Sequence, residues 1–110
     1  MKVGLIRCIQ TEDMCATTTC IRVMKEKQAA FEGEEDEVSL INVNTCGGCP
    51  GKKAVTRVAS MVSNGVDTIA LASCITKGSP IGFPCPHKEQ MVEAIRNKVG
   101  ENIRIITYTH

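Results

Sequence analysis

Aromatic side chains are nearly absent from this sequence of 110 residues, which has two phenylalanines, one tyrosine and no tryptophan. Proteins that bind single-stranded nucleic acids stack the bases on aromatic side chains, so we do not expect such a platform. An excess of charge is missing as well, because 13 basic and 12 acidic residues leave a formal net charge of +1. The sequence therefore predicts neither a nucleic-acid partner nor attraction to an anionic membrane surface.

Long apolar runs are also missing. The first apolar segment, Val3–Ile6, is short and lies between Lys2 and Arg7. The apolar core of a signal peptide needs roughly 7–15 residues, and a helix that spans a bilayer needs about 20. We therefore expect a cytoplasmic protein without a membrane partner.

Cysteine, in contrast, is abundant, with seven in the chain. Disulfide scaffolds are typical of small secreted proteins and usually contain an even number of cysteines. An odd number in a chain that we expect in the reducing cytoplasm favours metal binding, an iron–sulfur cluster or thiol redox chemistry over a structural disulfide framework.

Apolar residues alternate between the periods of strands and helices along the chain. The pattern predicts strands at Lys2–Arg7, Val38–Asn44, Val66–Ala72 and Ile103–Tyr108. It predicts helices at Cys20–Phe31 and Ala54–Ser63, and a last helix that carries Met91, Val92, Ile95 and Val99 and ends at Gly100. Such alternation is typical of a single α/β domain, residues 1–110, in which about four parallel strands form a three-layer arrangement with helices on both faces. We expect a flavodoxin-like or Rossmann-like fold.

The segment Thr45–Lys53 joins the second predicted strand to the following helix and carries two thiols, Cys46 and Cys49. Pro50 suits the first turn of a helix, which would make Cys49 the N-cap. Gly47 and Gly48 allow the backbone to fold tightly and to approach a bound group closely. The positive end of a helix dipole would then favour the thiolate forms that bind metals and exchange disulfides.

Other cysteines follow the same rule of placement. In parallel α/β sheets the ligand site lies beyond the carboxyl ends of the strands. Five cysteines stand at predicted strand ends or helix starts: Cys8, Cys46, Cys49, Cys74 and Cys85. Cys15, in a polar connector, is either a further ligand or a loop thiol, whereas Cys20 lies on an apolar helix face and is expected in the core.

Thiolates from several loops can share one zinc ion or iron–sulfur cluster, and an all-sulfur ligand set does not choose between the two. Four thiolates around a divalent ion leave negative charge, which nearby cations would balance. The predicted edge carries Arg7, Lys52, Lys53, Lys77 and Lys88. We therefore predict the metal ligands Cys8, Cys15, Cys46, Cys49, Cys74 and Cys85, with Gly47, Gly48 and Lys52 next to the bound group.

Two other interpretations remain open. A strand, C-x-x-C and helix is also the arrangement of thiol–disulfide exchange proteins. Cys46 would then attack, Cys49 or Cys74 would resolve the mixed disulfide, and the partner would be a redox protein. The third interpretation is an interaction domain whose cysteines are inert core residues. Gly51-Lys52 resembles the end of a phosphate-binding loop, but Cys46 occupies the first glycine position and Lys53 the Ser/Thr position, which argues against it.

The chain resembles the CGGC-domain family, small prokaryotic proteins described as metal-binding. The resemblance is carried by Arg7-Cys8, Thr11–Cys15, Cys46–Lys52, Ala72–Cys74 and Gly82–His87, and it runs from Met1 to His110. It implies a cysteine-lined metal site. Cys20 lies outside the matching segments, and His87 is either a ligand or an ordinary surface histidine. No arrangement of catalytic residues stands out, so the sequence predicts no particular reaction.

Overall fold

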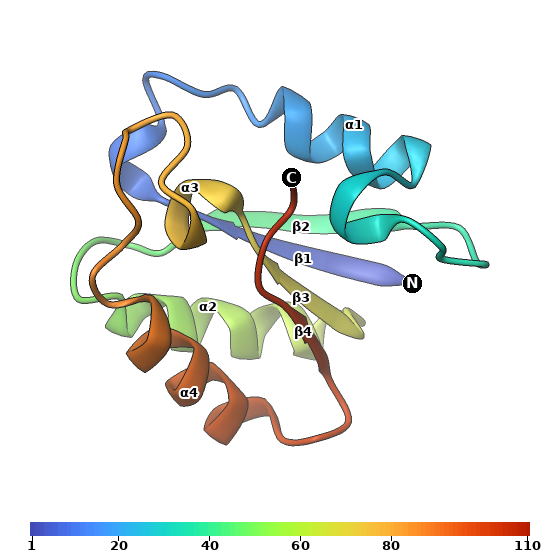
Figure 1. The fold of residues 1–110 in the computed structure, drawn as a ribbon. Helices are drawn as coiled ribbons and strands as arrows, with labels where there is room; N and C mark the ends of the chain where they lie inside the picture. The colour runs from blue at the N-terminus through green and yellow to red at the C-terminus, as the bar shows by residue number, and fades with distance from the viewer.

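Four parallel strands form the centre of the molecule in a computed structural model that describes residues 1–110 (Figure 1). The strands are β1 (Lys2–Arg7), β2 (Ser39–Thr45), β3 (Thr68–Leu71) and β4 (Arg104–Ile106). Their order is β2-β1-β3-β4, and every neighbouring pair is parallel. This order equals the first four positions of the flavodoxin-like order 2-1-3-4-5. The predicted α/β class with a four-stranded parallel sheet is confirmed.

Burial follows the position of each strand in the sheet. β1 and β3 are central, and their apolar side chains, such as Leu5 and Ile69, are fully buried. β2 is an edge strand, and its Ile41 and Val43 are exposed. Gly4 permits a close approach, because a Cβ at this position would lie 2.6 Å from Met61 Sδ. The central strands therefore fit the rule that parallel strands covered on both faces are almost entirely apolar.

Helices cover both faces of the sheet. α2 (Lys52–Ser63) and α4 (Lys88–Val99) lie side by side below the sheet in Figure 1, and α1 (Thr18–Glu26) lies above it. A very short helix, α3 (Ser73–Thr76), follows β3 directly. None of the helices has the length and apolar character that a membrane crossing requires.

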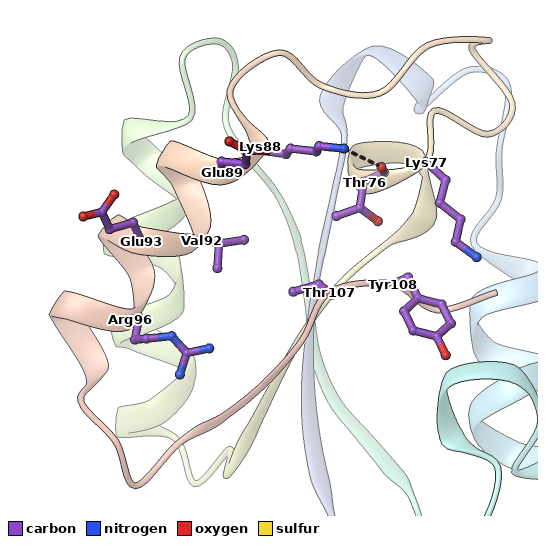
Figure 2. Close-up of a pocket in the computed structure, with 9 residues that line it drawn as sticks. All are labelled: Thr76, Lys77, Lys88, Glu89, Val92, Glu93, Arg96, Thr107 and Tyr108. Carbon is purple, nitrogen blue, oxygen red and sulfur yellow. Dashed lines mark hydrogen bonds between the residues drawn. The ribbon is translucent and has the colours of Figure 1, made fainter.

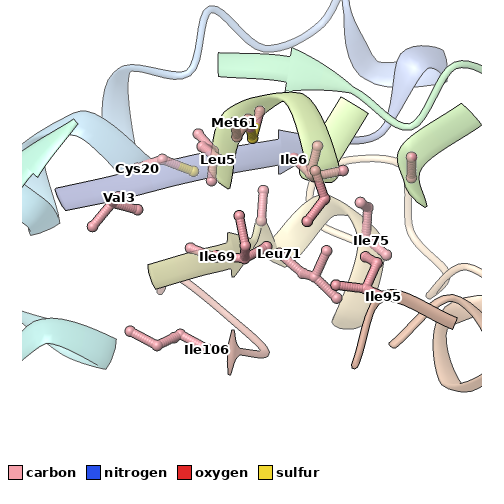
Figure 3. Close-up of a cluster of buried hydrophobic side chains, with 14 of the residues drawn as sticks. Val3, Leu5, Ile6, Cys20, Met61, Ile69, Leu71, Ile75, Ile95 and Ile106 are labelled. Carbon is pink, nitrogen blue, oxygen red and sulfur yellow. The ribbon is translucent and has the colours of Figure 1, made fainter. Parts of the chain in front are cut away.

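Side chains from the strands and helices meet in one apolar core (Figure 3). Leu5, Ile69 and Leu71 come from the central strands, and Ile95 comes from α4. Cys20 belongs to the same cluster and is only 5% exposed, as its place on the apolar face of the predicted helix indicated.

The first predicted helix, Cys20–Phe31, is too long. α1 ends at Glu26, because Lys27 adopts a left-handed conformation with φ of 54° and its N–H bonds the carbonyls of Met24 and Val23. The chain then reverses and forms a 3₁₀ turn, Ala29–Phe31. Phe31 still enters the core, which is why its apolar character suggested a continuing helix.

The predicted start of α2 is wrong. Cys49 is not the N-cap and Pro50 is not in the first turn, because α2 begins at Lys52 and its N-cap is Gly51 with φ of 92°. Glycine fits this position, since the left-handed conformation is unfavourable for other residues. The buried stripe of the helix is Ala54, Val58 and Met61.

The predicted start of α4 is also too early. Cys85 and Pro86 lie in the preceding loop, and the helix begins at Lys88 with His87 as its N-cap. Its face and end were predicted correctly, because Met91 and Ile95 are buried and Gly100 is the C-cap.

Candidate functional site

The carboxyl ends of three strands stand in register. Arg7 of β1 pairs with Thr45 of β2, and Ile6 pairs with Leu71 of β3. Two backbone bonds continue this alignment past the strand ends: Cys46 N–H donates to Arg7 O at 2.9 Å and Ala72 N–H donates to Ile6 O at 2.9 Å. The residues that follow the strands are therefore held at one edge of the sheet.

Four cysteines line one small pocket at this edge. The pocket has a volume of about 50 Å³ and is bounded by Cys8, Cys49, Cys74 and Cys85. Its other lining residues are Gln10, Ile81, Phe83 and Pro86. The cysteines come from the end of β1, the loop before α2, the start of α3 and the loop before α4. Thiols that are far apart in the sequence therefore meet in space.

Backbone N–H groups point at two of these sulfurs. Cys8 N–H donates to Cys74 Sγ at 3.2 Å, and His87 N–H donates to Cys85 Sγ at 3.4 Å. Cys85 is itself anchored by its N–H, which donates to Ile75 O at 2.7 Å. Donors of this kind are more favourable to a sulfur that carries negative charge than to a neutral thiol.

The thiols differ in exposure. Cys46 and Cys74 are each 6% exposed, Cys8 and Cys85 are half-buried, and Cys49 is exposed. Burial raises the pKa of Cys8 above the ordinary value of 9.0. A bond from the backbone of Gln10 lowers this pKa, whereas charge on the surrounding cysteines, including Cys46, raises it further. Cys8 is therefore a neutral thiol at pH 7 unless a cation joins it in the pocket.

Other predicted residues lie outside the pocket. Cys15 is in the loop before α1, where Thr17 N–H donates to its sulfur at 3.4 Å. Gly47 donates its N–H to Thr45 Oγ1 at 3.2 Å and, like Gly48, has a positive φ. Lys52 is exposed and lines a different cavity between α2 and α4. The proposed roles of these residues remain predictions.

Three of the cations predicted to balance the thiolates, Arg7, Lys77 and Lys88, lie against other groups. The Arg7 guanidinium donates to the carbonyls of Thr11 and Cys15. Lys77 and Lys88 line a separate groove next to α4.

Ile81 and Phe83 were missed by the sequence analysis. Both belong to the Gly/Pro-rich segment before Cys85, and both line the thiol pocket, where Phe83 is 56% exposed. Apolar residues in a loop rich in glycine and proline could have indicated a cover over a site, because loops normally expose polar residues to water.

The four pocket cysteines have the right chemistry for a metal site, but their sulfur atoms are not placed for one. Sulfur ligands from four cysteines suit zinc or iron–sulfur centres. No three His, Cys, Asp or Glu side chains are placed closely enough to hold a metal ion as they stand. The chemistry of the pocket therefore fits a thiophilic metal, but binding would require the thiol side chains to move together.

Comparison with known proteins identifies a family that matches almost the whole chain, including the cysteines at this edge of the sheet. The family model described as the CGGC domain matches residues 2–110. The uncharacterized protein MJ0582 of Methanocaldococcus jannaschii is 38% identical over 80 residues, which cover 67% of this chain and 62% of that protein. The uncharacterized protein MJ0766 of the same organism is 33% identical over 64 residues, which cover 57% of this chain and 91% of that protein.

No solved structure matches the chain. The family match extends over nearly the whole sequence and includes all the strand-end cysteines. The chain therefore belongs to the CGGC domain family.

Proposed function

We propose that the protein binds a metal, either a zinc ion or an iron–sulfur cluster, through the cysteines at the carboxyl edge of its sheet. One observation carries this proposal: Cys8, Cys49, Cys74 and Cys85 line the same pocket although they come from four different segments. Buried Cys46, whose charge acts on Cys8, is the fifth candidate ligand. Cys15 remains a sixth candidate, with a place at the site only if its loop moves.

The backbone donors support an anionic centre in this pocket. The N–H groups that reach Cys74 and Cys85 would stabilise metal-bound thiolates, and second-shell donors of this kind orient ligands and tune the metal. Metal binding would release the proton of Cys8, whose raised pKa keeps it protonated otherwise. The side chains of Ile81 and Phe83 would keep water away from the bound group.

Metal content tests the proposal. Protein purified without oxygen and with a reductant should contain close to one zinc ion per chain, or iron with visible absorption if a cluster is present. Cys74→Ser should lose most of this metal, since it removes a buried pocket sulfur. Cys20→Ala is the control, because it removes a core thiol that lies outside the pocket and is no candidate ligand. Equal metal content in wild type, Cys74→Ser and Cys85→Ser would refute the proposal.

Thiol–disulfide exchange is a second candidate, favoured by the exposure of Cys49 beside half-buried and buried pocket thiols. The exposed Cys49 thiolate would attack a substrate disulfide and release one thiol. A second pocket cysteine would then displace the other, which leaves the substrate reduced and the protein pair oxidised. Exposure favours Cys49 over the predicted Cys46 as the attacking thiol, because Cys46 is buried. Metal-free protein with a reversible thiol–disulfide couple that disappears in Cys49→Ser would favour this function.

A further inference from the structure

A second cavity, of about 600 Å³, lies between α4 and the segment that follows β4 (Figure 2). It shares no lining residue with the thiol pocket. Its volume falls within the roughly 300–1,000 Å³ that is usual for small-molecule sites. The space is large for a single ion and is open at the edge of the sheet, where β4 has only β3 as a neighbour.

The charged groups around this groove are arranged asymmetrically. Figure 2 shows that the ammonium group of Lys88 and the guanidinium of Arg96 extend toward the hollow, whereas the carboxylate of Glu93 points away from it. The single ion pair of the structure joins Arg104 to Glu34, so none of the cations that line the groove has a carboxylate partner. The lining as a whole carries three cations, Lys77, Lys88 and Arg96, against two carboxylates, Glu89 and Glu93. This excess of positive charge favours an anionic ligand.

The existing bonds of these cations are few. Lys88 Nζ donates to Thr76 O at 3.4 Å, which is a long hydrogen bond, and the Arg96 side chain makes no hydrogen bond. A guanidinium has five donors in a planar fork that matches carboxylate and phosphate oxygens. Lys77 differs, because its ammonium donates to His110 O at 2.9 Å and lies 4.5 Å from the centre of the Tyr108 ring. Lys88 and Arg96 are therefore the groups with free donors.

An unpartnered hydroxyl in the wall gives independent support. Thr76 lines the groove, and its Oγ1 is buried without any hydrogen-bond partner, so a ligand would bond it once the side chain turns toward the groove. A buried polar atom that lacks a partner is unfavourable and is normally satisfied by protein, water or ligand. In Figure 2 Thr76 lies across the groove from Val92, whose half-buried side chain supplies an apolar surface.

We propose that this groove binds a small anionic molecule whose phosphate or carboxylate is held by Lys88 and bonded by the Thr76 hydroxyl, while Arg96, two turns further along α4, attracts the anion from the other end of the groove. The rest of the ligand is a compact apolar group that packs on Val92. The volume of the groove accommodates such a body, whereas inorganic phosphate alone would leave most of the space empty. This site is independent of the proposed metal centre, because none of its residues is a thiol.

Nuclear magnetic resonance titration of the full chain with phenyl phosphate and benzoate tests the proposal and distinguishes the two anions. Benzylamine, which has a similar ring and the opposite charge, is the control ligand. We expect both anions, or one of them, to shift the backbone signals of Val92, Arg96 and Thr107, and benzylamine to leave them unchanged. Phenyl phosphate should bind more tightly than benzoate, because its second negative charge strengthens the attraction to the cations of the groove.

Three variants assign the binding to the groove. Lys88→Gln should weaken binding of the anion by about tenfold, the effect of losing one charge-assisted bond of about 1.4 kcal/mol. Arg96→Gln should weaken it less, because Arg96 attracts the anion from a distance. Lys98→Gln is the matched control, because it removes a cation from α4 outside the groove. Anions that cause no shift at 10 mM, anion affinity unchanged in both groove variants, or equal binding of benzylamine would overturn the proposal.

Thr76→Val tests the hydroxyl separately. Valine has nearly the shape of threonine and removes only the unpartnered oxygen. We expect it to weaken binding of the anion and to leave the unfolding temperature of the free protein unchanged or raised. Affinity equal to wild type, or a clearly lowered unfolding temperature, would contradict the assignment of this hydroxyl to the ligand.

Discussion

The cysteines of this protein are buried to different degrees, and burial changes the pKa of a thiol. Cys20, in the core, is the simplest example. Burial in the core raises the pKa of Cys20, although a hydrogen bond with the Thr109 hydroxyl at 3.2 Å lowers it in part. The folded chain therefore holds this proton more tightly than the unfolded chain does. The stabilisation is complete below the unfolded value, near 9.0, and is lost as pH rises through the folded pKa.

We predict that the free energy of unfolding falls as pH rises above about 9, by up to about 1.4 kcal/mol per pH unit for each such thiol. Denaturant titrations at several pH values, with a reductant present, measure this slope. Cys20→Val should reduce the slope, because it removes a buried titrating group. Cys49→Ala, which removes an exposed thiol, should keep it. If Cys20→Val had the same dependence of unfolding free energy on pH as the wild type, Cys20 would not contribute to it.

The sequence predicted which residues stand at strand ends but not how exposed each one is. Cys8, Cys74 and Cys46 follow the apolar runs that became β1, β3 and β2, so their edge could be inferred from the chain order alone. The burial of Cys46 and exposure of Cys49 depend on the path of the Gly47-Gly48 turn, whose positive φ angles leave several directions open. Local pattern does not determine such a path.

Helix α2 and the turn before it are joined by one side chain. Arg57 extends from α2 to the end of β2, where its guanidinium donates to Thr45 O at 2.9 Å and to Thr45 Oγ1 at 2.8 Å. Thr45 Oγ1 also accepts the N–H of Gly47. The position of the CGGC turn relative to the sheet therefore depends on Arg57.

We predict that Arg57→Met lowers the free energy of unfolding by about 1.5–3 kcal/mol, the usual contribution of hydrogen bonds from a charged group. The loosened turn should also expose Cys46, so its reaction with a thiol reagent should become faster. Denaturant titration and reagent kinetics measure the two effects. Arg22→Met, on exposed α1 surface, is the control and should change neither. If Arg57→Met unfolded with the wild-type free energy and its Cys46 reacted at the wild-type rate, the hydrogen bonds from Arg57 to Thr45 would not hold the turn in place.

The loop that closes the thiol pocket depends on Gly78. Gly78 has φ of 83°, and a Cβ there would overlap the backbone carbonyl of Phe83, which cannot move as a side chain can. Gly65 has a similar φ of 98°, but a Cβ there would meet nothing within 4 Å. The two glycines therefore separate the effect of backbone conformation from that of steric overlap.

We predict that Gly65→Ala costs about 1–2 kcal/mol of unfolding free energy, the penalty of a left-handed alanine. Gly78→Ala should cost about 3 kcal/mol or more, since overlap adds to the same penalty. It should also displace Phe83 and make Cys85 react faster with a thiol reagent. Equal destabilisation by both substitutions would mean that the close packing of this loop is not maintained in solution.

At the scale of helices and strands, the pattern predicted the four strands and the three long helices but often not their first residues, and it did not predict α3. The apolar face of α4 and its end at Gly100 were predicted because Met91, Ile95 and the glycine each carry a direct signal. The helix starts predicted at Pro50 and at Cys85 are too early, because a proline, here Pro50 or Pro86, also fits the turn before a helix. Since Cys49 and Cys85 belong to those turns, both thiols can approach the pocket from loops and are not fixed in helical turns.

At the scale of the whole molecule, the order of the strands in the sheet determines where the cysteines lie. The order β2-β1-β3-β4 puts the ends of β2, β1 and β3 next to one another, which collects thiols from distant parts of the sequence. The rule that ligand sites lie at the carboxyl edge predicted this gathering. The pattern gave no information on the groove beside β4, because its walls combine α3, α4 and the segment after β4.

Metal removal should affect the stability of the whole chain. A ligand that binds only the folded state at 100 times its dissociation constant stabilises it by about 2.7 kcal/mol. We therefore predict that a chelator, applied under reducing conditions, lowers the unfolding temperature of the wild type and has little effect on Cys74→Ser. The chelator should shift the unfolding temperature of Cys20→Ala as much as that of the wild type, because Cys20 lies outside the pocket. A chelator response that is the same in Cys74→Ser as in wild type would place the metal elsewhere.

X-ray absorption spectroscopy of the metal-loaded protein tests the central claim most directly, because it counts the sulfur atoms around the metal. We predict at least three sulfur ligands, at about 2.3 Å for zinc, and fewer in Cys74→Ser. A first shell made only of nitrogen and oxygen atoms would contradict the claim that the cysteines at this edge act together as one metal site.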